Sequence, residues 1–451
     1  MDIMRLMKEL MMKLLKVKDN TKIEKEKFIP VKSLKNKIAN KTLEQLAKEG
    51  IFVFPELINE TDDLTKNQMI MRSVNNLYQT GNVMGFLGLG DERLSIESRF
   101  SSGKNDYFFQ YLLEKVLDIP NIVEFETDEN QENKLFNLLI FLFPYFLKKA
   151  MRKGIYKIYV RRQYNDGNVK GTIEIARHVS KNTPFIGNIA YSQREYSYDN
   201  YLTELIRHTL EFIKQKPYGQ YLLPKVKDEI NAIISVTSNY KLHDRRKILA
   251  ENKCNPVRHA YYREYRALQN LCTLILQHQK HQIGIGTRQI YGILFDGAWL
   301  WEEYVNLLIK KDYYHPMNNG GKGAQRLIDN NIGLIYPDFI SRGSAHRIIA
   351  DAKYKPIDNI GNRDYLQVLA YMFRFDAKQG FYLYPESGTS TDLNLRLNMG
   401  TTYENNVKPR DNICLQKHGL KIPNAVNSYK EFKDAMKDAE EKFKTTLLNE
   451  V

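Results

Sequence analysis

The chain begins with apolar residues at helical spacing and then changes its pattern. The first apolar positions recur every three or four residues, which predicts a short amphipathic helix; they are Met4, Leu6, Met7, Leu10, Met11, Leu14 and Leu15. This helix either packs on its own domain or binds a partner. Residues 85–100 alternate between apolar and polar side chains and contain several glycines, so they predict strands joined by a tight turn. Residues 107–117 return to helical spacing, and residues 1–150 are therefore expected to form a mixed α/β domain.

Residues 151–283 are predicted to be a largely helical middle region that follows one basic strand. That strand, within residues 155–164, interleaves tyrosines with basic side chains, and the set comprises Lys148, Lys149, Arg152, Lys153, Tyr156, Lys157, Tyr159, Arg161, Arg162 and Tyr164. Such a mixture suits phosphate contacts supported by aromatic packing, so DNA contacts are expected here. An ordinary edge strand protected by basic residues would explain the pattern equally well.

Residues 284–451 are expected to form the last domain. A helix is predicted after Gly297, with inward-facing Trp299, Leu300, Tyr304, Leu307 and Leu308. Two apolar runs follow, which predict strands ending near Asp338 and Asp351. A further helix is expected to carry Gln367 and Tyr371, and the strand GFYLYP comes after it.

The composition favours a protein that binds a polyanion. Hydrophobic residues make up 43% and charged residues 27% of the 451-residue chain, as in ordinary globular proteins. The net charge of +14 is unusual, and it favours nucleic acid or an anionic surface as the partner. The apolar segment 135–147 is too short to span a bilayer and contains Pro144, so no membrane association and a cytoplasmic location are expected.

Two further classes of protein are excluded by motif. The three cysteines are scattered, which argues against a disulfide framework and against a structural zinc site. No phosphate-binding loop of the G-x-x-x-x-G-K-[ST] type occurs, because GGKGA at 320–324 has neither the spacing nor the hydroxyl. The chain is therefore not expected to hydrolyse nucleoside triphosphates itself.

The candidate chemistry lies in the strands that end near Asp338 and Asp351. Residues two apart on a strand share a face, so Asp351 and Lys353 are expected to point the same way. Pairing of the two strands would bring Asp338 beside Asp351, and close carboxylates repel each other unless a cation lies between them. Oxygen ligands of this kind suit Mg²⁺, or alternatively Mn²⁺, and Lys353 could orient or deprotonate an attacking water. A turn cap at Asp338 with a simple Asp351–Lys353 ion pair is the alternative.

Glu302 and Glu303 lie in the preceding apolar helix, where buried carboxylates need partners. One of them is expected to face the metal, and helical spacing alone does not distinguish them.

The order helix, strand, hairpin, helix, strand resembles the core of PD-(D/E)xK nucleases. The Gln367-x-x-x-Tyr371 element is similar to that of RecB-like nucleases, where both residues lie near the site and the DNA. The resemblance implies an α+β multidomain protein. Its C-terminal restriction-endonuclease-like α/β core would follow the helical middle region and the mixed N-terminal domain.

The chain also resembles McrC-type subunits of two-component restriction systems. FDGAWLWEEYV at 295–305 is similar to the family's helix, and YPDF, ADAKYK and the Q-x-x-x-Y helix follow it in the family's order. Upstream, residues 171–191 and 197–213 are similar to two further family segments, and SRF at 98–100 is closer to the LlaJI-like branch. Gly297 stands where the family commonly has methionine.

This resemblance implies a Mg²⁺-dependent DNA endonuclease subunit of a GTP-dependent restriction complex. Such subunits join a separate AAA+ GTPase, into whose ring the N-terminal region docks. The family pattern selects Glu302, with Asp338 and Asp351, as metal ligands, beside Lys353, Gln367 and Tyr371. Cleavage of double-stranded DNA would then need paired complexes or sequential nicks. A RecB-like exonuclease, and a non-catalytic activator that grips DNA for an AAA+ partner, are the competing hypotheses.

Overall fold

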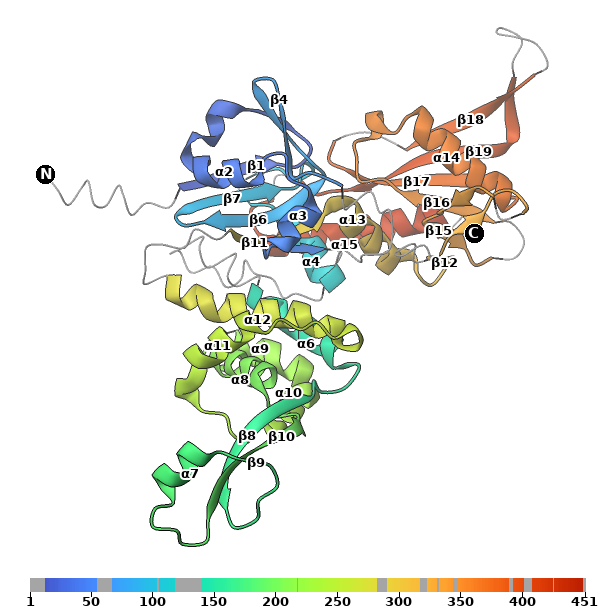
Figure 1. Cartoon of the computed structure of the whole chain (residues 1–451). Coiled ribbons are helices and arrows are strands. Elements are labelled where there is room, and N and C mark those ends of the chain that lie inside the picture. Colours follow the sequence, from blue (N-terminus) through green and yellow to red (C-terminus); the bar gives the residue numbers. More distant parts are fainter. Residues whose placement is uncertain are drawn as a thin grey trace, which may run out of the picture. The chain divides into compact units, whose positions relative to one another are not determined.

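A computed structural model of the chain divides it into two compact units, residues 1–129 with 286–451 and residues 130–285 (Figure 1). The structure describes residues 13–54, 67–103, 105–117, 139–216, 218–281, 290–316, 323–330, 332–343, 347–388, 392–400, 408–424 and 426–448. The start of the expected N-terminal helix lies outside these ranges, and so does the acidic segment 123–133, for which the sequence predicts a surface loop. The two units differ from the expected domains 1–150, 151–283 and 284–451, because the first and last segments of the chain fold together.

The first sheet of unit 1 combines strands from both ends of the chain. Its order is β1-β7-β6-β11-β3, made by Lys13–Lys18, Glu92–Glu97, Val83–Leu89, Tyr291–Asp296 and Phe52–Phe54. The predicted turn between residues 85 and 100 is confirmed, since β6 and β7 pair antiparallel. Leu14 and Leu15 were predicted to be helical and this is wrong, because both lie in β1, which pairs parallel with β7.

Short elements cover this sheet and close its apolar core. They are β2 (Lys22–Glu24), η1 (Lys25–Val31), α2 (Lys32–Ile38), α3 (Leu43–Lys48), β4 (Met71–Val74) and β5 (Leu77–Thr80). Phe28, Val31, Leu34 and Ile38 from η1 and α2 are fully buried against residues of β6, β7 and β11. Thr42 caps α3 in a capping box with Gln45, which ends the preceding loop and starts the helix.

The second sheet of unit 1 lies in its C-terminal part. Its order is β12-β15-β16-β17-β19-β18, made by Tyr313–Tyr314, Phe339–Ser341, Ile348–Ala352, Gln379–Glu386, Lys408–Lys421 and Leu393–Met399. The strands β16, β17 and β19 run parallel, whereas β15 runs antiparallel to β16. The hairpin β13 (Gln325–Arg326) and β14 (Leu334–Ile335) lies before β15.

Helix α14 (Asn362–Arg374) makes the crossover between β16 and β17 and packs close to the sheet. Val368 and Met372 from this helix share a core with Tyr382 and Leu415 of the strands. Gly380 permits this approach, because a Cβ there would lie 2.7 Å from the sulfur of Met372 and 2.6 Å from Leu415. The predicted helix with Gln367 and Tyr371 and the predicted strand after it are both confirmed.

Helix α13 (Gly297–Ile309) continues directly from β11 and packs on α4 (Tyr107–Leu117) and α15 (Tyr429–Leu448). Tyr111 and Tyr304 donate hydrogen bonds to the same Glu440 oxygen, at 2.6 and 2.7 Å. The helix itself is confirmed, but Leu307 is exposed and Trp299 and Leu308 are only half-buried. Trp301 is instead fully buried, and its indole donates to the Leu383 carbonyl.

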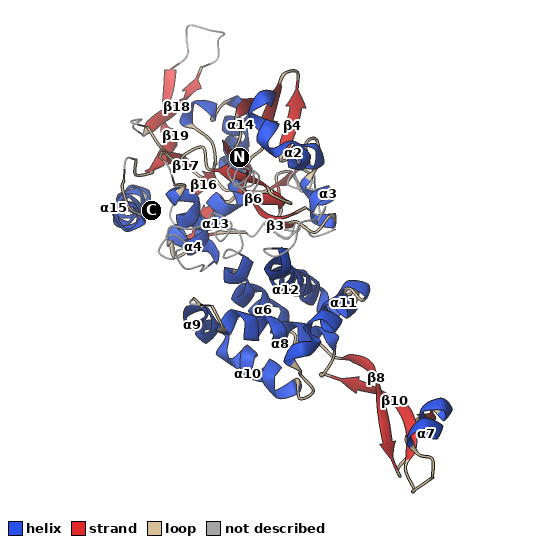
Figure 2. Cartoon of the chain, turned by 90° about the vertical axis from the view of Figure 1, so that its left-hand side faces the viewer, coloured by secondary structure: helices blue, strands red, loops and turns tan. Residues whose placement is uncertain are grey.

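Unit 2 is a group of helices from which a strand ribbon projects (Figure 2). The helices are α6 (Phe143–Met151), α8 (Tyr201–Lys214), α9 (Gly219–Leu222), η3 (Leu223–Val226), α10 (Lys227–Val236), η4 (Leu242–Asp244), α11 (Arg245–Cys254), η5 (Ala260–Tyr262) and α12 (Arg263–His281). The ribbon consists of β8 (Ile158–Asp166) and β10 (Ile189–Ser197), with β9 (Thr172–Ile173) and α7 (Ile175–Lys181) near its tip. The predicted basic strand and the mainly helical region after it are confirmed.

Candidate active site

Asp338 and Asp351 are brought together by the pairing of β15 with β16. Phe339 lies opposite Ala350 in this antiparallel ladder, so the next position of the same register sets Asp338 opposite Asp351. The Ala352 amide donates to Asp338 Oδ2 at 2.8 Å, which holds this carboxylate at the strand end. The two carboxylates therefore meet because strand pairing fixes their register.

Lys353 lies on the same side as Asp351, with 2.5 Å between Lys353 Nζ and Asp351 Oδ2. The Lys353 amide donates to the Leu383 carbonyl, so the backbone stays paired with β17 at this position. Lys353 Nζ also donates to Gln367 Oε1 at 3.2 Å, and Gln367 Nε2 donates to the Tyr371 hydroxyl at 2.7 Å. The ammonium is thus held between the strand carboxylate and helix α14.

The sequence did not point to Asp364, which completes this arrangement. Its carboxylate accepts hydrogen bonds from Lys355 Nζ at 2.8 and 2.7 Å and lies 3.7 Å from Lys353 Nζ. It also accepts from the Gly361 amide at the start of α14, which fixes it at the helix N-terminus. An acidic residue three positions after a glycine helix start was the signal that could have revealed it.

Glu302 is the glutamate of α13 that faces the strand carboxylates. Burial, followed by the charges of Asp338, Glu303 and Asp351, raises its pKa well above the ordinary value. Glu302 Oε1 also lies 3.6 Å from His315 Nε2, and the other ring nitrogen of His315 contacts the Asp338 carbonyl. The structure therefore groups Glu302, rather than Glu303, with Asp338 and Asp351.

His315 is a second residue that the sequence did not indicate. Its Nδ1 lies 2.8 Å from the Asp338 carbonyl and must donate to it, since a carbonyl only accepts. Its Nε2 then faces Glu302 Oε1 at 3.6 Å. His315 follows β12, a two-residue strand whose pairing with β15 is not visible in the sequence pattern.

The buried carboxylates Asp338 and Asp351 have few hydrogen-bond donors around them in the described residues. Burial, together with the charge of Asp351, raises the pKa of Asp338 to about 8. Asp351 is 1% exposed, and neither of its oxygens accepts a well-formed hydrogen bond from the described residues apart from the close Lys353 ammonium. Burial alone would lower the pKa of Lys353, but Asp351 and Asp338 raise it above its ordinary value.

These donors fit a hard divalent cation in their chemistry, because such ions prefer carboxylate oxygens. Within the described ranges, however, no three His, Cys, Asp or Glu side chains lie close enough together to hold a metal ion. Asp338, Asp351 and Glu302 thus supply the right oxygens without forming a complete ligand set by themselves.

Comparison with known proteins gives the class of the chain, a component of a restriction system. A family model described as "McrBC 5-methylcytosine restriction system component" matches residues 78–385, more than half of the chain. The chain belongs to this McrBC family. No curated protein matches it.

The fold is also similar to that of a solved structure. This structure is a half-complex from a tetradecameric assembly of Thermococcus gammatolerans McrB AAA+ hexamers with bound McrC. It matches with a TM-score of 0.51 and 14% identity, over 97% of this chain and 100% of that chain. The McrBC complex of the same organism matches with a TM-score of 0.31 and 12% identity, over 66% of this chain and 87% of that chain. Among the described residues, no helix is long and apolar enough to cross a membrane.

Proposed function

We propose that this chain is the Mg²⁺-dependent DNA endonuclease subunit of a GTP-dependent restriction complex, active when assembled with an AAA+ GTPase. The observation that carries the proposal is the grouping of Glu302, Asp338, Asp351 and Lys353 at one end of the second sheet. Helix α13, the β15–β16 hairpin, helix α14 and β17 follow one another in the order of the PD-(D/E)xK core. A McrC-type subunit lies beside AAA+ hexamers in the related assembly, which supports such a partner here.

In this proposal the chain's own residues position water and phosphate. Asp338 and Asp351, with Glu302 directly or through water, would hold Mg²⁺ or Mn²⁺, which when bound polarises a phosphoryl oxygen and acidifies a water. Lys353 lies against Asp351 and Gln367, so its charge is fixed where negative charge develops on the phosphorus. Asp364 and Tyr371 orient the ends of that network and limit its motion.

The test compares Asp351→Ala and Lys353→Ala with Asp358→Ala, an exposed carboxylate in the same segment. The complex with the AAA+ partner is incubated with plasmid DNA, GTP and Mg²⁺. We expect each of the first two variants to lose about 10²–10³-fold in cleavage rate, since removal of one group that stabilises the transition state typically costs that much. GTP hydrolysis by the partner should stay unchanged in all three. Persistent cleavage by Asp351→Ala would refute the assigned site.

A non-catalytic activator is the second candidate, because the described carboxylates do not form a closed metal-binding group. An activator would stimulate GTP hydrolysis, yet neither the wild-type complex nor Asp358→Ala would cleave DNA. The same experiment therefore separates the two functions, and a covalently closed plasmid also excludes an exonuclease that needs ends.

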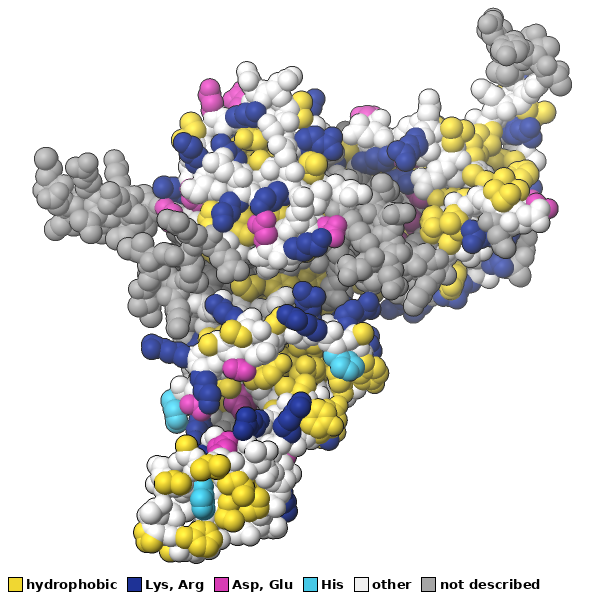
Figure 3. Space-filling model, viewed as in Figure 1, with side chains coloured by type: hydrophobic (Ala, Val, Ile, Leu, Met, Phe, Trp, Pro, Cys, Tyr) yellow, Lys and Arg dark blue, Asp and Glu magenta, His cyan; other side chains and the backbone are white. Residues whose placement is uncertain are grey.

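The docking surface for the AAA+ partner is expected within residues 1–150 by family resemblance. The two most exposed apolar side chains of unit 2, Ile175 and Ile186, instead indicate the tip of its ribbon, where exposed apolar residues gather around α7 (Figure 3). Ile175 and Ile186 are 73% and 78% exposed, and Val179 and Phe185 are similarly open. Such contiguous apolar patches commonly mark protein interfaces. Ile175→Ser with Ile186→Ser should weaken co-purification with the partner and leave the fold of the chain unchanged.

Double-strand cleavage would require two copies of the site or sequential nicks. Helix α14 carries Gln367 and Tyr371 on the face toward Lys353, and it exposes Leu366 (70%) and Phe373 (87%) on its other side. We propose that this face contributes to the pairing of complexes. Phe373→Ser should then reduce double-strand breaks relative to nicks.

A further inference from the structure

The β8–β10 ribbon of unit 2 has two faces with different chemistry. Its strands pair from Ile158 opposite Ser197 to Asp166 opposite Ile189, so alternate side chains point to opposite faces. We define the outer face by the exposed residues at alternate positions and their flanks, namely Lys157, Tyr159, Arg161, Gln163, Arg194, Tyr196 and Tyr198. The inner face carries the residues between them.

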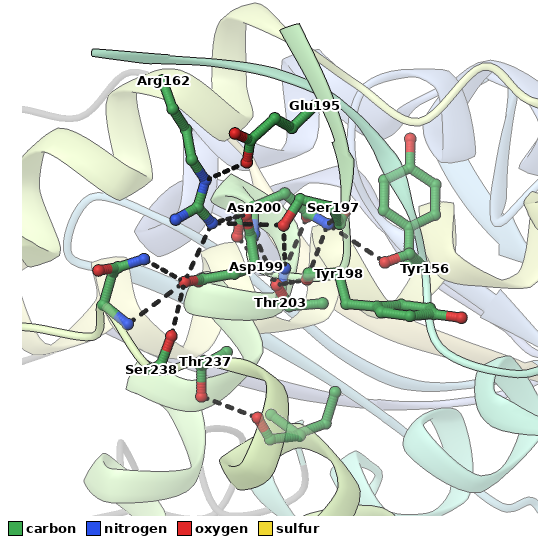
Figure 4. A network of polar contacts seen from close by, with 12 residues as sticks. Tyr156, Arg162, Glu195, Ser197, Tyr198, Asp199, Asn200, Thr203, Thr237 and Ser238 are labelled. Atoms are coloured by element: carbon green, nitrogen blue, oxygen red, sulfur yellow. Dashed lines mark hydrogen bonds and ion pairs between the residues drawn. The ribbon is translucent and has the colours of Figure 1, made fainter. Parts of the chain in front are cut away.

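The inner face neutralises its own charges. Arg162 lies 3.3 Å from Asp199 and 3.7 Å from Glu195 (Figure 4). Tyr164 donates a hydrogen bond to Glu195. Asp199 also accepts hydrogen bonds from Asn239. These contacts join the ribbon to the helices of unit 2, so the inner face has a structural role.

The outer face, in contrast, is a ladder of exposed rings and cations. Tyr159 and Tyr196 lie directly opposite each other with ring centroids 5.0 Å apart, and they are 63% and 51% exposed. The Arg194 guanidinium lies over the Tyr159 ring at 5.3 Å. Lys157 Nζ lies over Tyr196 at 4.7 Å and over Tyr198 at 4.6 Å. Rings and cations thus alternate along one surface of the ribbon.

The outer face carries more positive than negative charge, which favours an anionic partner. Arg161 lies directly opposite Arg194, and like charges in that position are destabilising unless they are compensated. Arg161 is 3.4 Å from Glu174, but that carboxylate is already bound by Arg177 at 2.5 Å. Within the described residues, no carboxylate forms an ion pair with Lys157 or Arg194. The outer face therefore carries excess positive charge beside exposed tyrosine rings that are not part of the core.

We propose that this outer face binds a single strand of DNA, with bases stacked on Tyr159 and Tyr196 and phosphates beside Arg161, Arg194 and Lys157. Stacking of bases on exposed aromatic rings, combined with a cationic track, is how proteins hold unpaired strands without reading their sequence. Paired bases in a duplex are already stacked on one another and cannot use the rings. The inference deepens the proposed function, but it concerns binding alone and does not depend on cleavage.

The experiment measures fluorescence anisotropy of a labelled oligo(dT) and of a duplex of equal length, with the full chain in EDTA. Wild type should prefer the single strand. Tyr159→Ala with Tyr196→Ala should weaken single-strand binding at least about tenfold, since each lost stacking contact is worth about 1–3 kcal/mol. Duplex binding should change less than about threefold. Tyr159→Phe with Tyr196→Phe should bind as wild type, and Tyr221→Ala, an exposed tyrosine elsewhere in unit 2, is the matched control.

A charge variant gives an independent measurement if the alanine pair disturbs the ribbon. Arg194→Gln should reduce the slope of log affinity against log salt for the single strand by about 0.7, the value for one lost phosphate contact. An unchanged slope, or equal loss of binding in the phenylalanine pair, would overturn the proposal. So would a wild-type chain that binds the duplex better. If the alanine pair binds DNA normally but no longer co-purifies with the AAA+ partner, the face is a protein interface. Loss of cleavage with intact strand binding would bear only on the nuclease proposal.

Discussion

Replacing Gly297 by alanine tests how tightly the site helix is fixed. The added Cβ would lie 2.6 Å from Cε1, 3.0 Å from Cδ1 and 3.2 Å from Cζ of Tyr354. Carbon atoms in contact prefer about 3.5–4.0 Å, so the ring or the helix must move by roughly 0.9 Å. The ring is 4% exposed and has little freedom.

Contacts from the N-terminal sheet hold that ring in place. The Tyr354 hydroxyl lies 2.8 Å from Ser98 Oγ, and the Arg99 guanidinium stacks on the ring at 4.9 Å. Arg99 is in turn bound to the buried carboxylate of Asp19 at 2.6 Å. We therefore expect α13 to yield rather than the ring, and Glu302 moves with the helix.

The sign of the change in the free energy of unfolding caused by Gly297→Ala shows which of two opposing effects is larger. Alanine in place of glycine normally stabilises a helix by about 0.5–1 kcal/mol, whereas overpacking costs about 1–3 kcal/mol. We expect Gly297→Ala to lose about 1–2 kcal/mol, a fall in Tm of a few degrees. Cleavage should fall up to about 10²-fold, because a shift near 1 Å at a reacting group has that effect.

Differential scanning fluorimetry and plasmid cleavage measure the two effects. Gly167→Ala is the control, since its added Cβ meets only one carbonyl oxygen at an ordinary 3.5 Å. Tyr354→Leu removes the clashing ring carbons, so Gly297→Ala should cost less in that background. A higher Tm with full cleavage for Gly297→Ala alone would refute the reasoning.

Three further predictions follow from buried polar groups. Burial raises the pKa of Asp106 to about 7, so the folded state binds this proton more tightly than the unfolded state. The free energy of unfolding should therefore fall by up to about 4 kcal/mol as the pH rises from about 4 to 7. Urea titrations at several pH values should show a smaller dependence on pH for Asp106→Asn. Glu440→Ala leaves the hydroxyls of Tyr111 and Tyr304 without their acceptor and should cost about 2–4 kcal/mol in the same assay. Mg²⁺ at about 100 times its Kd should stabilise wild type by about 2.7 kcal/mol, and EDTA should abolish the gain; Asp351→Asn should show none, while a gain equal to wild type would contradict its assignment.

Local rules were sufficient for much of the candidate site. The side-chain alternation of a strand placed Asp351 and Lys353 on one face, and a short hairpin placed Asp338 opposite Asp351. The sequence pattern predicted one helix that carries Gln367 and Tyr371, and on that helix their spacing of four residues brings the two side chains into contact. Each of these relations spans few residues, so sequence pattern determines it.

Features that depend on distant pairing could not be predicted in this way. Leu14 and Leu15 have helical spacing, yet parallel pairing with β7 makes them part of a strand. His315 enters the site because the two-residue β12 pairs with β15. The choice of Glu302 over Glu303 came from family resemblance. In the structure Glu302 lies 3.6 Å from His315, whose other ring nitrogen contacts the Asp338 carbonyl.

Because β11 pairs with β6 and β3, the first sheet of unit 1 cannot be completed until residues 291–296 have been synthesised. The strand β3 is bonded only to β11 within its sheet, and about 200 residues separate the end of β6 from the start of β11. At about 5–20 residues per second, a ribosome needs roughly 10–40 s to supply that strand. During this interval the nascent N-terminal half exposes unpaired strand edges, while unit 2 emerges and can fold on its own. Yield in cells should therefore depend on chaperones that cover those edges until the C-terminal part of unit 1 has been synthesised.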